Sequence, residues 1–219
     1  MRERHEILQL TLVYGTLGFR ASLEATSHAR CAEVCGRLLP WLERIGLASQ
    51  IKPLHHDILT NAHGSLPEDL RTEAYWRGES ASLLGWSIGL LDHPDPVVPV
   101  DPNVLVKQLQ MLQPKAMELL EFANVPTVEE IKRYCAFCLA VRNRFQMMSL
   151  GSDHQGLFDN LYRTTIVELG LSMDSIYSDA TLAEATQHVM NANDTRGLYV
   201  VRALTAEWLF GEDDEPGLE

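Results

Sequence analysis

The sequence predicts a mainly α-helical fold: a single-domain irregular multi-helix bundle built around a central buried helix at about residues 67–91. Through most of the 219 residues, apolar side chains recur at three- and four-residue steps, the spacing of one helix face. Residues that begin or end helices separate these segments. The sequence has no alternation of strand and helix patterns and no internal repeat, so neither a parallel α/β sheet nor a repeat protein is expected.

The N-terminal third begins with a segment whose pattern fits two structures. Residues 7–19 are rich in β-branched and aromatic side chains, so a short strand and an irregular first helix both fit. Residues 26–45 have helical spacing, with Pro40 expected to kink or divide the helix. A further short helix is expected between residues 47 and 64.

The central helix is expected to begin at Pro67, because two acidic residues follow in the first turn, where the helix dipole favours negative charge. Residues 92–102 follow it and contain four prolines, which exclude regular structure. We therefore expect a rigid, extended surface connection there. Helical spacing resumes at Val104 without a flexible Gly/Ser segment, so this connection does not separate two domains.

The C-terminal half contains one strong helix-start signal. Thr127 is followed three residues later by Glu130, the spacing of a capping box, and predicts a helix that ends near Gly151. Further helices are expected at residues 154–169, 182–190 and 194–210. The predicted domain spans residues 1–211, and residues 212–219 form an acidic tail that is expected to be disordered.

Composition and charge limit the function classes. The formal net charge is −12, of which the tail carries five negative charges, leaving −7 for the body. An acidic body repels nucleic acid and anionic membranes, and it favours solubility or a basic protein partner. No apolar run reaches the roughly 20 residues of a membrane helix, and the N-terminus lacks signal-peptide features. A cytoplasmic protein that binds neither nucleic acid nor membrane is therefore predicted.

Cysteines and histidines give no metal signature. The pairs Cys31/Cys35 and Cys135/Cys138 lie among apolar residues in predicted helices, which is typical of buried free thiols rather than of a zinc site. His55 is followed directly by a second histidine, and adjacent residues on a helix point in different directions. We therefore predict neither a metal nor a cofactor.

The central helix carries a carboxylate on an apolar face. At 100° per residue, Trp76, Glu79 and Trp86 fall on one side of the helix. An unpaired buried carboxylate costs several kcal/mol, so a partner is expected. Arg142 and Arg202 both interrupt apolar faces and are the candidates. Either an arginine clamps Glu79 and fixes the helix register, or the two tryptophans wall a ligand pocket that contains the acid and an arginine.

Three short motifs resemble those of a mostly bacterial helical family of unknown function. The central motif comprises Trp76, Arg77, Glu79, Leu83, Leu84, Trp86 and Gly89. A later segment, residues 140–143, and a C-terminal one, residues 202–209, are similar to the other two family motifs. Asn143 and Val201 stand where the family usually has acidic residues. The resemblance implies a helical fold, and these departures imply that a polar active site, if the family has one, is incomplete here.

Two function classes follow. The first is a non-enzymatic acidic binding protein, most concretely an immunity-type inhibitor that captures a basic toxin in the cytoplasm, because such a protein needs charge and shape complementarity but no chemistry. The alternative is an enzyme or small-molecule receptor in which Glu79 acts as general base or ligand anchor beside Arg142 or Arg202 in a tryptophan-lined pocket. The missing catalytic motifs favour the first class. The sequence does not predict the oligomeric state.

Overall fold

The computed structural model describes residues 1–26, 28–95, 98–150 and 193–211, and it confirms the mainly α-helical prediction. The elements are α1 (Arg4–Glu24), α2 (Ala29–Arg44), η1 (Ala48–Gln50), α3 (Pro53–Thr60), α4 (Glu68–Ser87), α5 (Pro102–Gln108), η2 (Ala116–Phe122), α6 (Val128–Leu150) and α10 (Asn193–Leu209). The helices predicted at residues 154–169 and 182–190, and the tail, lie outside the described residues. Among the helices that are described, none is both long and apolar enough to cross a membrane.

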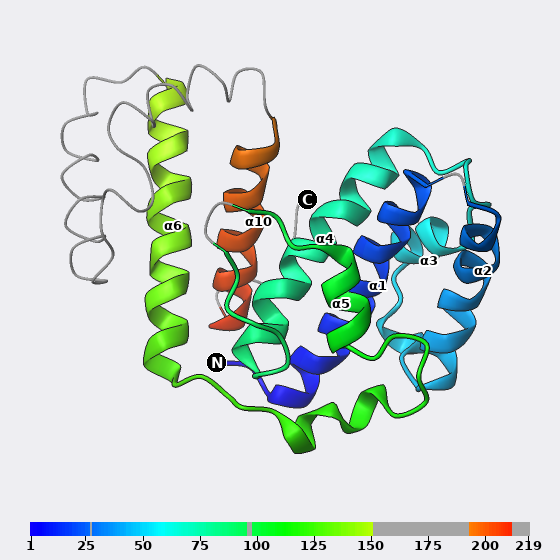
Figure 1. The fold of residues 1–219 in the computed structure, drawn as a ribbon. Coiled ribbons are helices and arrows are strands. Elements are labelled where there is room, and N and C mark those ends of the chain that lie inside the picture. The colour runs from blue at the N-terminus through cyan, green and yellow to red at the C-terminus, as the bar shows by residue number, and fades with distance from the viewer. Residues whose placement is uncertain (27, 96–97, 151–192, 212–219) are drawn as a thin grey trace.

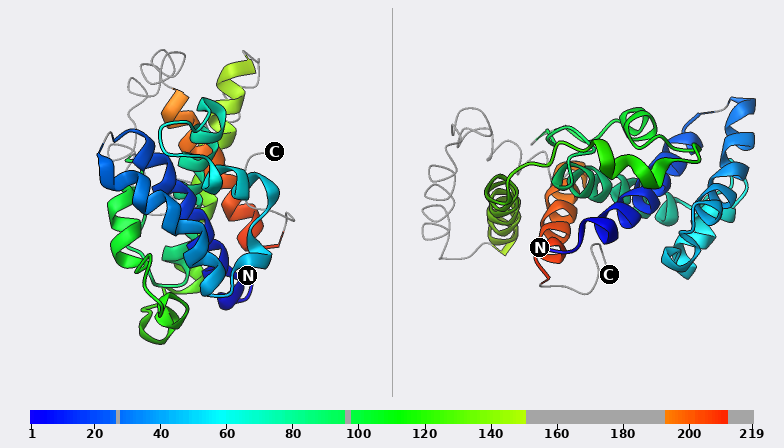
Figure 2. Two further views of the ribbon diagram at one scale, coloured as in Figure 1. Left: turned by 90° about the vertical axis from the view of Figure 1, so that its right-hand side faces the viewer. Right: turned by 90° about the horizontal axis from the view of Figure 1, so that it is seen from below.

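The helices stand side by side in a row, in the order α6, α10, α4, α1 and then α2 with α3 (Figure 1; Figure 2). The short helix α5 packs on α1 and α4. A continuous cluster of buried apolar side chains includes members from α1, α2, α4, α6 and α10. Every residue from 76 to 87 of α4 is buried, which confirms the prediction of a central buried helix.

The N-terminal strand considered from the sequence is not present, because residues 7–19 belong to the helix α1. This helix is buried on most of its circumference, so β-branched and apolar residues are needed on every side and no helical periodicity is visible. Thr11 and Thr16 satisfy their buried hydroxyls by donating to the carbonyls of Ile7 (2.7 Å) and Leu12 (2.6 Å). Tertiary burial thus outweighs the β-propensity of the segment.

Small residues let α1 and α4 approach closely. Gly18 faces Gly78, and a Cβ atom on Gly18 would lie only 2.6 Å from the Cα of Gly78. One turn away, a Cβ on Gly15 would be 3.7 Å from the Cβ of Ala81. The later residue of α1 faces the earlier residue of α4, and the earlier residue of α1 faces the later one, so the two helices run antiparallel. Because α10 and α5 also pack on α4, this helix has no solvent-facing side over its second half.

The central helix ends at Ser87, earlier than the predicted position near residue 91. Gly89 adopts a left-handed conformation, with φ of 78°. The N–H of Leu90 donates to the carbonyl of Gly85 (2.9 Å), and the N–H of Gly89 donates to that of Trp86 (2.8 Å). This is the hydrogen-bond pattern of a Schellman cap, which closes the helix although apolar residues continue beyond it.

Two other sequence signals have different outcomes. The capping box is confirmed: the N–H of Thr127 donates to Oε2 of Glu130 (2.7 Å), and the N–H of Glu130 donates to Oγ1 of Thr127 (3.2 Å). Pro40 does not divide the helix that contains it, because α2 continues to Arg44. The proline nitrogen cannot donate to the carbonyl four residues earlier, so α2 tolerates the loss of that hydrogen bond.

We expect Gly18→Ala to lower the free energy of unfolding by about 1–3 kcal/mol, because the added methyl group would overlap the backbone of Gly78. Gly36→Ala is the matched control in an exposed helix position where nothing lies within 4 Å, and it should be neutral or stabilise by up to about 1 kcal/mol. Urea unfolding followed by circular dichroism measures both. A Gly18→Ala protein as stable as the Gly36→Ala protein would contradict the close helix contact.

Candidate functional site

Glu79 of α4 pairs with Arg202 of α10, which decides between the two arginines proposed from the sequence. Nη2 of Arg202 donates to Oε2 of Glu79 at 2.9 Å, and Nε donates to the same oxygen at 3.3 Å. Glu79 is 1% exposed and Arg202 is 0% exposed. The carboxylate on the apolar face of the central helix is therefore part of a fully buried ion pair.

The proline-rich connection completes this pair with its backbone. The N–H of Val100 donates to Oε1 of Glu79 at 2.6 Å. Arg202 donates through Nη1 to the carbonyl of Asp95 (2.6 Å) and through Nη2 to that of Val98 (3.4 Å). The described residues of this connection are mostly exposed or half-buried, as predicted, but three of its backbone groups turn inward and contact the buried charges.

Tyr134 links a third helix, α6, to the buried ion pair. Nη1 of Arg202 donates to its hydroxyl oxygen at 3.0 Å. The thiol of Cys138, one turn further along α6, interacts with the same hydroxyl. Burial raises the pKa of Tyr134 well above its usual value, so this hydroxyl stays protonated. Arg202 thus connects α4, α6, α10 and the proline-rich connection.

Burial and pairing act in opposite directions on the charge of Glu79. Desolvation raises the pKa of Glu79, while the charge of Arg202 and the N–H of Val100 oppose that rise. The pKa of Arg202 is raised as well. Burial lowers this pKa, but the neighbouring acidic groups, Tyr134 and Glu79 among them, outweigh the effect of burial. Both carboxylate oxygens of Glu79 are occupied, Oε1 by Val100 and Oε2 by Arg202. The arrangement is that of a structural ion pair.

Arg142 belongs to a separate ion pair. It donates through Nη1 and Nη2 to Oε2 (2.9 Å) and Oε1 (2.7 Å) of Glu207, a bidentate contact that joins α6 to α10. These side chains are 16% and 17% exposed, so this pair keeps some access to water, unlike that of Glu79. Arg142 therefore takes no part in the buried cluster for which the sequence made it a candidate.

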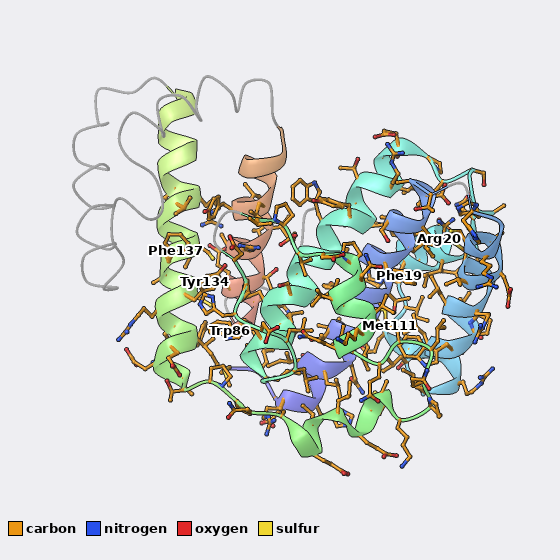
Figure 3. The ribbon with its side chains drawn as sticks, viewed as in Figure 1. Phe19, Arg20, Trp86, Met111, Tyr134 and Phe137 are labelled. Atoms are coloured by element: carbon orange, nitrogen blue, oxygen red, sulfur yellow. The ribbon has the colours of Figure 1, made fainter. Side chains whose placement is uncertain are left out.

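The two tryptophans lie in different places. The ring of Trp76 packs against the backbone of Gly197 and forms a small apolar cluster with Leu198 and Val201. Trp86 lies near Tyr134 instead, with ring centroids 5.3 Å apart (Figure 3). Trp76 lines a cavity of about 300 Å³ and Trp86 one of about 470 Å³, and Glu79 lines neither of them. The predicted pocket with both tryptophans around Glu79 is thus not formed by these two cavities.

The larger of these cavities is a polar cleft between the end of α4 and the start of α6. Its lining residues are Trp86, Gly89, Leu91, Asp92, His93, Asn124, Val125, Pro126, Thr127 and Glu130. Hydrogen bonds from the side chain and backbone of Thr127 hold the pKa of Glu130 below its usual value. Partial burial lowers the pKa of His93, so its ring is neutral at neutral pH. The cleft therefore presents two carboxylates and no compensating histidine charge.

The four cysteines are free and buried, as the sequence predicts. Burial raises the pKa of Cys138 to about 12, which makes it a poor nucleophile and a poor metal ligand at neutral pH. Within the described ranges, no group of three or more His, Cys, Asp or Glu side chains could hold a metal ion.

Sequence reasoning missed Tyr134, His93 and the backbone groups of the proline-rich connection. Tyr134 follows the apolar spacing of α6, which conceals the polar role of its hydroxyl. The backbone groups leave no side-chain pattern at all. One usable signal existed: carbonyls in a segment rich in proline have few N–H partners of their own, so they are available to a buried guanidinium.

No protein-family model, curated protein or solved structure matches this chain. The resemblance to a bacterial helical family therefore stays a prediction from its three motifs. Those motifs do meet in space. Glu79 of the first contacts Arg202 of the third, and Arg142 of the second contacts Glu207 of the third.

We expect Glu79→Gln to lower the free energy of unfolding by about 3–5 kcal/mol, because it leaves Arg202 buried without a counter-charge. Glu207→Gln makes the same chemical change where water can reach Arg142, so its cost should be about 1–2 kcal/mol. Urea unfolding of both variants measures the difference. A stable Glu79→Gln protein would contradict a structural role for the buried pair.

Proposed function

We propose that this protein is a non-enzymatic acidic binding protein that captures a basic protein partner in the cytoplasm. Its most concrete form is an immunity-type inhibitor that neutralises a toxin by covering it. The observation that supports this most directly is the excess of acidic residues that remains once the arginines of low exposure are paired inside the protein.

Four arginines of low exposure each form an ion pair with a glutamate of the same chain. The pairs are Arg20–Glu24, Arg77–Glu73, Arg142–Glu207 and Arg202–Glu79. Each pair is neutral, so the net charge of −12 is carried entirely by the other residues. An excess of accessible negative charge speeds encounter with a positively charged protein and disfavours acidic competitors.

The alternative is an enzyme or small-molecule receptor that uses Glu79. The raised pKa of Glu79 favours it, because shifted carboxylates are common at catalytic sites. Two observations weigh against it. Both oxygens of Glu79 already accept hydrogen bonds from Val100 and Arg202, and the side chain is only 1% exposed, so a ligand has little access to it. The cavities lined by Trp76 and Trp86 are separate.

The immobilised protein should retain a basic protein from a lysate of its source cells at low salt. It should release that protein near 1 M salt, where the Debye length falls to about 3 Å. Mass spectrometry identifies what is retained, and titration calorimetry with the purified partner tests for a defined stoichiometry. Retention of proteins without a bias toward basic ones, or binding that is insensitive to salt, would count against the proposal.

The inhibitor role has its own test. The captured protein, expressed alone, should arrest growth of a bacterial host, and co-expression of this chain should restore growth because the complex blocks the toxic surface. Colony counts with and without co-expression measure the effect. Glu79→Gln, which is expected to be poorly folded, serves as a negative control. A captured protein that is harmless when expressed alone would refute the inhibitor role and leave only the binding role.

A further inference from the structure

We propose that the polar cleft between α4 and α6 receives an arginine side chain of the basic partner. This inference rests on the proposed function and names the chemistry by which the partner is recognised. The cleft measures about 470 Å³, enough for a guanidinium group and part of its aliphatic stem.

The two carboxylates of the cleft still have acceptor capacity. Asp92 accepts a hydrogen bond from Gln108 through Oδ2 (2.8 Å), and Glu130 accepts from Thr127 through Oε2. Within the described part of the chain, no hydrogen bond uses Oδ1 of Asp92 or Oε1 of Glu130. These two carboxylates come from different elements of the cleft wall, one from the segment after α4 and the other from the first turn of α6.

His93 supplies a third acceptor. Its Nδ1 lies 2.9 Å from the carbonyl oxygen of Pro94, which can only accept, so Nδ1 carries the proton of the neutral ring. Nε2 is then an acceptor. Because partial burial lowers the pKa of His93, the ring stays neutral and does not repel a cation. Edge-to-face contacts with Trp86 (4.8 Å) and Tyr134 (4.7 Å) hold the ring in its orientation.

A guanidinium matches this set of groups better than an ammonium does. It has five N–H donors in one plane and no acceptor, so it can donate to acceptors on several sides while its faces lie on rings. An ammonium has three donors and a tightly held hydration shell. Among the lining residues, Val125 is 37% exposed, and its side chain can pack on the aliphatic stem of an arginine.

The test uses two monocations of similar size, 1-propylguanidinium and butylammonium, added to the full-length protein at low salt. Two-dimensional ¹H–¹⁵N NMR should show saturable shifts at the amides of residues 124–130 and at the Trp86 indole. The guanidinium should bind about tenfold more tightly than the ammonium, since it forms at least one more charge-assisted hydrogen bond. Equal affinity, or shifts spread over the whole surface, would overturn the inference.

The double variant Asp92→Asn/Glu130→Gln keeps the acceptor for Gln108 and the capping box, because glutamine also serves at that position. It should bind propylguanidinium at least about tenfold more weakly than the wild type. The control Glu33→Gln/Glu43→Gln removes the same charge from exposed positions of α2 and should bind normally. Equal weakening in both variants, or none in the cleft variant, would overturn the inference, provided that thermal unfolding confirms folding.

The same variants separate this inference from the proposed function. If a basic partner is captured equally by wild type and by the cleft variant, the cleft inference is wrong while the proposed function stands. If no basic partner is captured at all, the proposed function fails. The cleft is then still judged by the propylguanidinium titration, which needs no partner.

Discussion

The structure depends on a guanidinium that is buried completely and satisfied completely. Arg202 makes five hydrogen bonds, to Glu79 twice, to Tyr134 once and to the carbonyls of Asp95 and Val98, which equals the five N–H groups of the side chain. A buried charge is tolerable only when such partners are present. Two helices and the proline-rich connection are thereby fixed against α10, and their relative positions are set by one side chain.

The same interaction shapes the polar cleft. The connection that follows α4 carries Asp92 and His93 at its start, and it is tied to Arg202 and Glu79 further along, through Asp95, Val98 and Val100. Tyr134 contacts Arg202 through its hydroxyl and His93 through its ring. A side chain with no solvent access therefore positions the groups that do reach solvent. The buried pair belongs to the architecture, yet any ligand of the cleft would depend on it.

The sequence predicts the elements far better than their contacts. The position of Glu79 on an apolar face and the capping box at Thr127 follow from local spacing, and both are found in the structure. Whether Glu79 meets Arg142 or Arg202 depends on how α6 and α10 pack, and no local pattern contains that information. The segment 7–19 was ambiguous because a helix buried on most sides loses its periodicity. The early end of α4 was set by the left-handed Gly89 against continuing apolar residues.

Separating the internal charges from the surface charges has an energetic consequence. Unpaired negative charges repel one another and destabilise the compact state, and this cost grows with net charge. The neutral pairs of Arg20, Arg77, Arg142 and Arg202 do not add to it. A partner that brings a guanidinium between Asp92 and Glu130 would reduce that repulsion at the place where it binds. Binding to the folded state alone must also stabilise that state by mass action. On the proposed function, capture of a basic partner and stabilisation of the acidic protein are therefore the same event, and both weaken together as salt screens the charges.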